Sequence, residues 1–116
     1  MGGGQLGYDL ILSNTDPDLI KMEMDIYWIV RGGADPVTLF HKYPGRFKLF
    51  HVKDMDKANN LINTEVGSGT IDFKKIFANA KLAGLDYAFV EQENFGMDWD
   101  ASITQSASYL KNELLK

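Results

Sequence analysis

The amino-acid sequence predicts an α/β protein built from parallel βα units. Three short apolar segments are predicted to be strands, at residues 19–26, 47–52 and 87–91. Segments with helical spacing of their apolar residues lie between and after these strands, and turn-forming or capping residues separate the elements. Strands that alternate with helices are typical of a parallel sheet with crossover connections, so we expect one such sheet.

The composition limits the classes of function. The chain has 116 residues, is 45% hydrophobic, has a net charge of −4 and contains no cysteine. This charge disfavours binding to nucleic acid or to an anionic membrane. Without cysteine there is no disulfide framework or thiolate metal site, so any metal must be held by carboxylates, imidazoles and carbonyls. The longest apolar runs are about four residues, far below the roughly 20 that span a bilayer, so we expect no membrane segment.

The first residues resemble neither a signal peptide nor a structural element. MGGGQLGYDL lacks a basic n-region and an apolar h-region. We expect residues 1–7 to be a loop or an artificial join, and the true start of the protein to lie upstream. Residues 8–12 are expected to be a helix remnant that ends at the turn formers of residues 14–17. We expect a cytoplasmic location, and export stays open because the true N-terminus is not identified.

Two helices are predicted from the residues that begin and end them. Asp35 followed by Pro36 is typical of a helix N-cap and first position, and residues 44–45 (Pro-Gly) end that helix. Asp72 caps the next helix, and Gly84 stands where a left-handed C-terminal residue is needed. We assign these two capping aspartates no chemistry.

A last helix is predicted near the end of the chain. Either Asp98 or Asp100 can begin it, and we assign Asp100 no chemistry. Its expected apolar stripe consists of Ile103, Ala107, Leu110 and Leu114.

Each predicted strand ends in, or runs directly into, a possible ligand for a hard metal ion. These residues are Asp25, His51 and Glu91. Taken singly, each is more typical of a turn group, a half-buried imidazole or an ion-paired carboxylate. The carboxyl ends of parallel strands lie on one face, however, so three donors from separate strands are expected to converge there. Two carboxylates and an imidazole suit Mn²⁺, Mg²⁺, Co²⁺ or Zn²⁺ and do not distinguish between them.

Five strings in this order resemble the sugar phosphate isomerase/epimerase family, the xylose isomerase-like TIM barrels. They are MEMDIYW, GGADPV, FHVKD, EVGSGTIDF and FVEQE. The resemblance covers residues 8–116 and is to the C-terminal half of that family. It implies that residues 1–116 form a single segment, about half of a (β/α)8 barrel.

The resemblance also implies a set of metal ligands. Such enzymes hold a divalent metal with a Glu, an Asp, a His and a second Glu on four successive strands. Carried over by motif, the last three are Asp25, His51 and Glu91, and Glu91 is also the candidate catalytic acid/base. The first Glu has no counterpart, and we expect it on a strand before Tyr8.

Further residues are expected to contact substrate. Relatives often carry a substrate-binding His three residues after the metal Asp, where this chain has Trp28, which could instead stack on the apolar face of a sugar. Lys53 is expected to hold a substrate hydroxyl or phosphate, and Asp54 to orient the substrate or the imidazole. The pair Gly67 and Gly69 is weak support for phosphate binding and more typical of a turn.

The implied activity is isomerisation or epimerisation of a sugar or sugar phosphate, by proton transfer through an enediolate with a divalent metal. A keto-inositol dehydratase of the same superfamily is an alternative, because the same enolate can expel a β-hydroxyl. We expect the chain to be inactive as this fragment, since a TIM barrel typically needs ~250 residues.

Two other interpretations remain. The chain could be a non-catalytic half-barrel that self-associates, so the expected partner is a second copy of the chain or a missing N-terminal half. A barrel nuclease of the endonuclease IV type is disfavoured, because it needs a His-rich multi-zinc site and a basic groove. This chain has two histidines, of which His41 is expected to face solvent, and a pI near 5.0.

Overall fold

The computed structural model describes residues 7–116, which contain a three-stranded parallel sheet in the order β1-β2-β5. These strands are β1 (Met22–Asp25), β2 (Phe47–Val52) and β5 (Tyr87–Val90). The predicted α/β class with parallel βα units is confirmed, and the arrangement is that of a partial TIM barrel. The prediction for residues 1–7 lies outside the described residues except for Gly7, which begins α1 (Gly7–Ser13).

The first strand is shorter than predicted. It begins at Met22 and ends at Asp25, whereas the sequence suggested residues 19–26. The carboxylate of Asp25 accepts a hydrogen bond from the backbone N–H of Trp28 and so caps a helix, α2 (Ile26–Arg31), that was not predicted. An N-cap at the strand's last residue therefore turns the chain directly from strand into helix.

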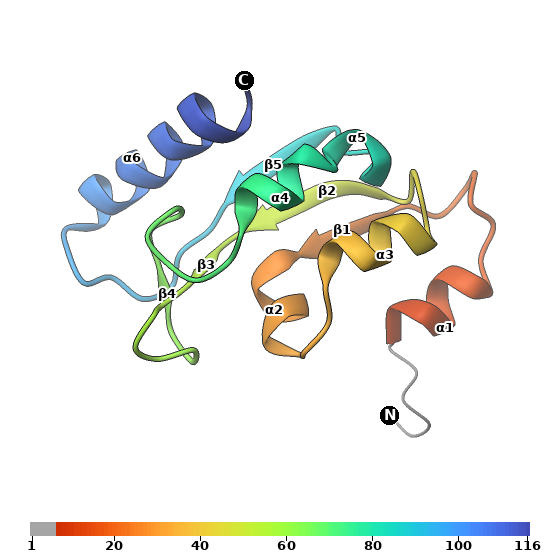
Figure 1. Cartoon of the computed structure of the whole chain (residues 1–116), viewed down its shortest axis with the longest axis horizontal. Helices are drawn as coiled ribbons and strands as arrows, with labels where there is room; N and C mark the ends of the chain where they lie inside the picture. Colours follow the sequence, from red (N-terminus) through yellow and green to blue (C-terminus); the bar gives the residue numbers. More distant parts are fainter. Residues whose placement is uncertain (1–6) are drawn as a thin grey trace.

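Helices cover one face of the sheet (Figure 1). They are α3 (Pro36–Lys42), α4 (Phe73–Ala78) and α5 (Ala80–Ala83). Asp35 and Asp72 cap α3 and α4 as predicted, and Gly84 ends α5 with φ of 89°. The helix predicted after Asp72 is divided in two at Asn79. No helix within residues 7–116 has the length and apolar character needed to cross a membrane.

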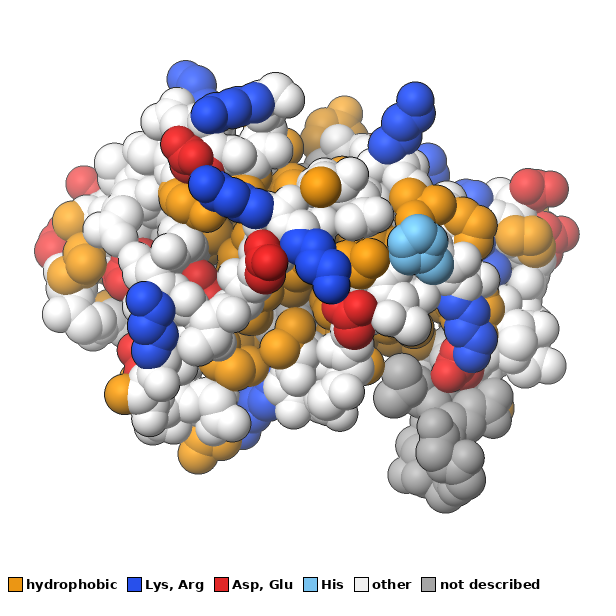
Figure 2. Space-filling model, in the orientation of Figure 1, with side chains coloured by type: hydrophobic (Ala, Val, Ile, Leu, Met, Phe, Trp, Pro, Cys, Tyr) orange, Lys and Arg blue, Asp and Glu red, His pale blue; other side chains and the backbone are white. Residues whose placement is uncertain are grey.

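The core lies between the sheet and these helices. Met24, Phe50 and Val52 are fully buried, and the ring of Phe40 on α3 stacks on Phe50 with centroids 5.4 Å apart. Figure 2 shows the outer surface of the helical layer, where charged side chains are interspersed with hydrophobic ones. The sheet residues that alternate with the core residues point to the opposite face, where Phe89 is 48% exposed.

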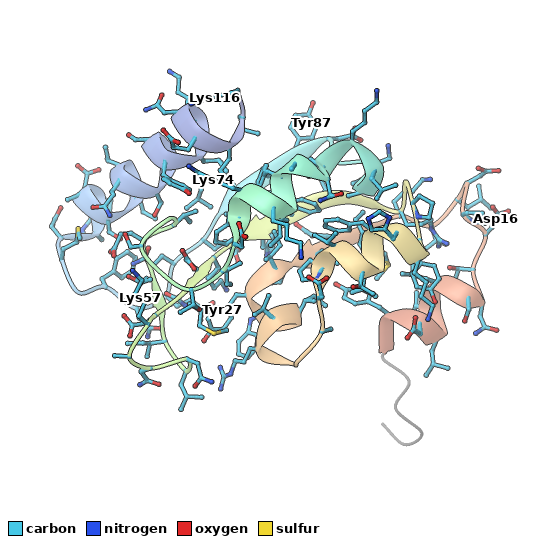
Figure 3. All side chains as sticks on the ribbon, viewed as in Figure 1. Asp16, Tyr27, Lys57, Lys74, Tyr87 and Lys116 are labelled. Atoms are coloured by element: carbon cyan, nitrogen blue, oxygen red, sulfur yellow. The ribbon has the colours of Figure 1, made fainter. Side chains whose placement is uncertain are left out.

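A two-stranded antiparallel ribbon follows β2. It consists of β3 (Asp54–Met55) and β4 (Asn63–Thr64), and neither strand was predicted. The phenolic hydroxyl of Tyr27 donates a hydrogen bond of 2.8 Å to the carbonyl of Asn60 in the loop of this ribbon. Tyr27 accordingly lies beside the loop that carries Lys57 (Figure 3).

The C-terminal helix packs beyond β5 (Figure 1). It is α6 (Trp99–Tyr109), continued by a π-helical turn η1 (Leu110–Leu114), and its N-cap is Asp98 rather than Asp100. The predicted apolar stripe is wrong at two of its positions, because Ile103 and Ala107 are exposed. Their preceding residues Ser102 and Ser106 are buried instead, and both side chains form hydrogen bonds to the β4 region.

Candidate functional site

The structure brings Asp25, His51 and Glu91 together at the carboxyl ends of the three parallel strands. Each offers one donor atom, and the three atoms lie within 4.8 Å of one another. Asp25 is paired with His51 in the β1-β2 register, and the backbone N–H of Glu91 donates to the carbonyl of Val52. The sheet thus fixes the backbone of all three residues.

The donor atoms of this cluster face one another. Nδ1 of His51 lies 3.0 Å from Oε2 of Glu91 and 3.8 Å from Oδ2 of Asp25. The other carboxylate oxygen of Asp25 accepts the N-cap hydrogen bond from Trp28, which leaves Oδ2 directed at the cluster. All three side chains are half-buried, so a cation could enter from solvent.

Lys53 lies next to the cluster and is almost completely buried. Its Nζ lies 2.6 Å from Glu93, 3.4 Å from Asp25 and 3.5 Å from Glu91. Burial lowers the pKa of Lys53, but the hydrogen bond to Glu93 and the charges of the three carboxylates outweigh it, so the pKa is raised above its ordinary value. The side chain is therefore a fixed positive charge in the site.

Two acidic residues of the site were not predicted from the sequence. Glu23 contacts the ring of His51, with Oε1 2.6 Å from Nε2, and Glu93 contacts Lys53. Each lies two residues from a predicted ligand, Glu23 before Asp25 and Glu93 after Glu91. Alternation along β1 places Glu23 and Asp25 on one face, so this spacing could have found Glu23, whereas Glu91 and Glu93 lie beyond the end of β5 and the same rule does not apply to them.

The structure does not bring Asp54 to this cluster. Its carboxylate is fully buried and accepts hydrogen bonds from the backbone amides of Met55, Gly67, Gly69 and Ile71, at 2.8 to 3.1 Å. Burial raises the pKa of this carboxyl, although the four amides act in the opposite direction. Asp54 therefore organises the loop after β4.

The two glycines of the VGSG motif serve this loop. Gly67 has φ of 93°, which favours glycine, and a side chain on Gly69 would collide with Asp54 and with the carbonyl of Met55. Both backbone amides are hydrogen-bonded to the Asp54 carboxylate. The motif thus shapes the loop around a buried carboxylate, in agreement with its interpretation as a turn.

Trp28 lies on the surface of α2 beside the cluster. Its side chain is half-exposed, and the guanidinium of Arg31 lies 4.8 Å from its ring centroid. Trp28 also lines an apolar pocket of about 330 Å³ between α1 and α2, together with Tyr8 and Ile29. An aromatic face is thus available one helical turn from Asp25.

The loop after β5 borders a cleft of about 210 Å³ against β4. Glu65 lies in its wall and accepts hydrogen bonds from Ser102, Gln92 and Thr64. Burial raises the pKa of Glu65, but these hydrogen bonds outweigh it and lower the pKa to about 2. The second polar atom of Gln92, Oε1, is buried and has no hydrogen-bond partner within residues 7–116.

Comparisons with known proteins agree with the resemblance seen in the sequence. No family model matches the chain. Two crystal structures of sugar phosphate isomerase/epimerases from Parabacteroides distasonis ATCC 8503 superpose with TM-scores of 0.78 and 0.79, at 38% and 35% identity. They are matched over 93% and 100% of this chain, which corresponds to 36% and 40% of their own chains.

Curated relatives are named inosose dehydratases. The protein from Lacticaseibacillus casei is 31% identical over 73% of this chain, and the protein from Geobacillus kaustophilus (strain HTA426) is 34% identical over 68%. The matched part is 34% and 30% of these two relatives, so this chain spans about a third of their length. In sequence and fold, the chain resembles part of the xylose isomerase-like superfamily.

Proposed function

We propose that this chain, which resembles part of the sugar phosphate isomerase/epimerases, supplies part of a site that holds a divalent metal and transfers a proton next to a sugar carbonyl, and that the chain by itself is nearly inactive. The observation that carries the proposal is the convergence of Asp25, His51 and Glu91 on one point at the ends of three parallel strands. Ligands and catalytic groups gather at this end of parallel sheets.

The chemistry of the donor set fits a divalent cation. Two carboxylates and an imidazole without thiolates suit Mn²⁺, Mg²⁺, Co²⁺ or Zn²⁺. Four carboxylates surround the site, whereas Lys53 supplies the one ammonium group that contacts them among the described residues. This excess of negative charge favours a cation between Asp25, His51 and Glu91. A cation bound there would polarise a carbonyl and an adjacent hydroxyl of the substrate.

The proposed roles of the side chains follow from their positions. Glu91 is 40% exposed at the strand end, so its carboxylate can reach a substrate carbon and remove or return a proton. Lys53 is held by three carboxylates and can donate to a substrate hydroxyl or phosphate oxygen. Trp28 offers its exposed ring as a stacking surface for a sugar.

Metal binding is tested by calorimetric titration of the chain with MnCl₂. Asp25→Asn removes a charged ligand but keeps the helix cap, because Asn is also a good N-cap residue. We expect this variant to bind Mn²⁺ roughly tenfold or more weakly than the unmodified chain. Asp86→Asn is the matched control, since Asp86 precedes β5 at the opposite end of the sheet and pairs with Lys48. Equal affinities of all three proteins, or no binding by any, would refute the site.

Keto-inositol dehydration is a second candidate, because the curated relatives are named inosose dehydratases. Both reactions begin with removal of a proton next to a carbonyl, and dehydration additionally expels a β-hydroxyl. NMR after prolonged incubation in D₂O with Mn²⁺ distinguishes them, even at the very slow rate expected of this chain alone. Deuterium incorporation into a ketose supports the isomerase or epimerase, whereas loss of water from a keto-inositol supports the dehydratase.

The chain is also proposed to self-associate through the uncovered face of the sheet. Tyr87 and Phe89 are 69% and 48% exposed there, which is unusual for neighbouring aromatic residues on a strand. A second copy of the chain could cover this surface.

A further inference from the structure

Glu23 contacts the side of the His51 ring that faces away from the other candidate ligands. Its Oε1 lies 2.6 Å from Nε2, whereas Nδ1 of the same ring faces Glu91 and Asp25. The two ring nitrogens of His51 therefore have different partners: Nε2 faces Glu23, and Nδ1 faces the proposed metal site.

A neutral imidazole carries a single N–H, and only its other nitrogen can bind a metal. Two carboxylates compete for the proton of His51, Glu23 at 2.6 Å from Nε2 and Glu91 at 3.0 Å from Nδ1. If Glu91 received it, Nδ1 would carry the proton and could not be a ligand. A proton on Nε2, hydrogen-bonded to Glu23, leaves the Nδ1 lone pair directed at the cation.

We infer that Glu23 is a positioning residue that holds His51 in the Nε2–H tautomer and so presents Nδ1 as a metal ligand. The metal part of this inference rests on the proposed function, whereas the tautomer is a property of the metal-free chain. A carboxylate behind a metal-bound histidine commonly fixes its tautomer and raises its basicity as a ligand.

The sheet gives Glu23 a defined position for this role. Its partner in the parallel register is Leu49. Glu23 and Leu49 lie two residues before the pair of Asp25 and His51 on their strands, and so on the same face of the sheet. The side chain of Glu23 thus reaches diagonally across to the imidazole. On the other side, the ring of Phe89 meets that of His51 edge to face at 6.3 Å, so the imidazole is oriented by both neighbouring strands.

The tautomer is measured by ¹⁵N NMR of histidine-labelled, metal-free protein at about pH 9, where an ordinary imidazole is neutral. The unmodified chain should show His51 with the proton on Nε2. Glu23→Leu removes the acceptor and should shift the proton toward Nδ1, whereas Glu23→Gln keeps an acceptor oxygen and should largely restore the original spectrum. Asp86→Asn serves as the control for loss of one acidic residue and should not change it.

Metal affinity is the second readout. Titration with MnCl₂ should show roughly 10- to 100-fold weaker binding by Glu23→Leu and a smaller loss for Glu23→Gln. An unchanged Nε2–H tautomer in Glu23→Leu would overturn the inference. If Glu23→Leu does not fold, Glu23→Asp, whose carboxylate is too short to reach Nε2, gives the same comparison. Absence of Mn²⁺ binding by the unmodified chain would refute the proposed metal site, while the tautomer would still decide the role of Glu23.

Discussion

Some carboxylates of this chain stabilise the fold through hydrogen bonds to the backbone, whereas others are accessible to a ligand. Asp25 is the last residue of β1 and Asp54 is the first residue of β3, and the sequence predicted a role in the site for both. Asp54 is fully buried and its oxygens accept four backbone amides, whereas Asp25 keeps one oxygen directed at a half-exposed cluster. The partners of a carboxylate, and not its position in a motif, separate these two roles.

Asp54→Asn is expected to destabilise the fold strongly. The amide group of Asn would point N–H donors at the N–H donors of the loop, which leaves buried donors unpaired, at a cost of about 2 to 4 kcal/mol. Urea unfolding followed by circular dichroism measures this loss. The exposed control Asp86→Asn should change stability little. If Asp54→Asn were as stable as the control but bound Mn²⁺ more weakly, Asp54 would instead belong to the site.

Glu65 predicts a particular dependence of stability on pH. Its pKa is about 2 in the folded chain and 4.5 ordinarily, so the unfolded chain binds the proton more tightly between these values. The stabilisation by Glu65 is therefore complete above about pH 4.5 and is lost as the pH falls toward 2, with an upper limit of ~3 kcal/mol. Unfolding free energies measured from pH 6 to pH 2.5 should show this loss, and Glu65→Gln should reduce it. An equally steep loss in Glu65→Gln would assign the effect to other groups.

At the scale of elements, local chemistry predicted some boundaries well. The strand at residues 47–52 was predicted at its observed limits, and the caps of α3 and α4 were correct, because these features depend on a few adjacent residues. The ribbon β3-β4 and the helix α2 were missed. The two strands of the ribbon contain only two residues each, too few for an apolar pattern, and their pairing depends on contacts distant in sequence.

The last helix shows why a periodic pattern can give the wrong face. Ile103 and Ala107 formed the expected stripe, yet Ser102 and Ser106 face the protein. Ser102 donates to Glu65, and Ser106 accepts from the backbone N–H of Val66. The hydrogen bonds of these two serines therefore determine which face of α6 is buried. The spacing of apolar residues in the sequence cannot predict such hydrogen bonds.

Ser106→Ala is expected to weaken the docking of α6. The substitution leaves the buried N–H of Val66 without its acceptor, which costs about 1 to 2 kcal/mol. Ser108→Ala in the same helix is the matched control, because Ser108 is exposed and Ala has the higher helix propensity. Chemical denaturation of both variants measures the difference. Equal stabilities would show that the serine hydroxyl does not hold the helix in place.

The candidate site was predictable where a general rule of topology applied. Three ligand-type residues at the ends of three parallel strands had to lie at one edge of the sheet, and the structure places them there. The contacts of Glu23 and Glu93 depend on side-chain reach across neighbouring strands, which sequence spacing only suggests. Whether the three residues hold a metal remains a prediction for the titration described above.

At the scale of the whole molecule, the helices within residues 7–116 cover only one face of the sheet. The helices α3, α4 and α5 lie over the face that carries Met24 and Phe50 (Figure 1). The other face carries the candidate site and the exposed side chains of Tyr87 and Phe89, with Tyr87 at the start of β5 (Figure 3). In a closed barrel the corresponding face lines the interior.

An open face has a consequence for catalysis by the chain on its own. Water has free access to the cluster of Asp25, His51 and Glu91, which keeps the local dielectric high and weakens electrostatic stabilisation of developing charge. We therefore expect very slow deuterium exchange into a ketose by this chain, even with Mn²⁺ present. Rapid exchange that persists in Glu91→Gln would contradict both this expectation and the proposed role of Glu91.

The exposed aromatic residues of the sheet predict self-association of the chain. Burying Tyr87 and Phe89 against a second copy would remove apolar surface from water, at about 25 cal/mol per Å². Sedimentation velocity over a range of concentrations should show a dimer or larger species. Tyr87→Lys should shift the chain toward the monomer, because a charged side chain opposes burial of this face. Residue 87 pairs with Leu49 and not with His51, so we expect the substitution to leave the metal cluster intact. Leu19→Lys is the matched control, since Leu19 is 76% exposed in the segment before β1 and lies outside the sheet. A chain that remains monomeric at high concentration, or that associates equally well with lysine at position 87, would show that this face does not bind a second copy.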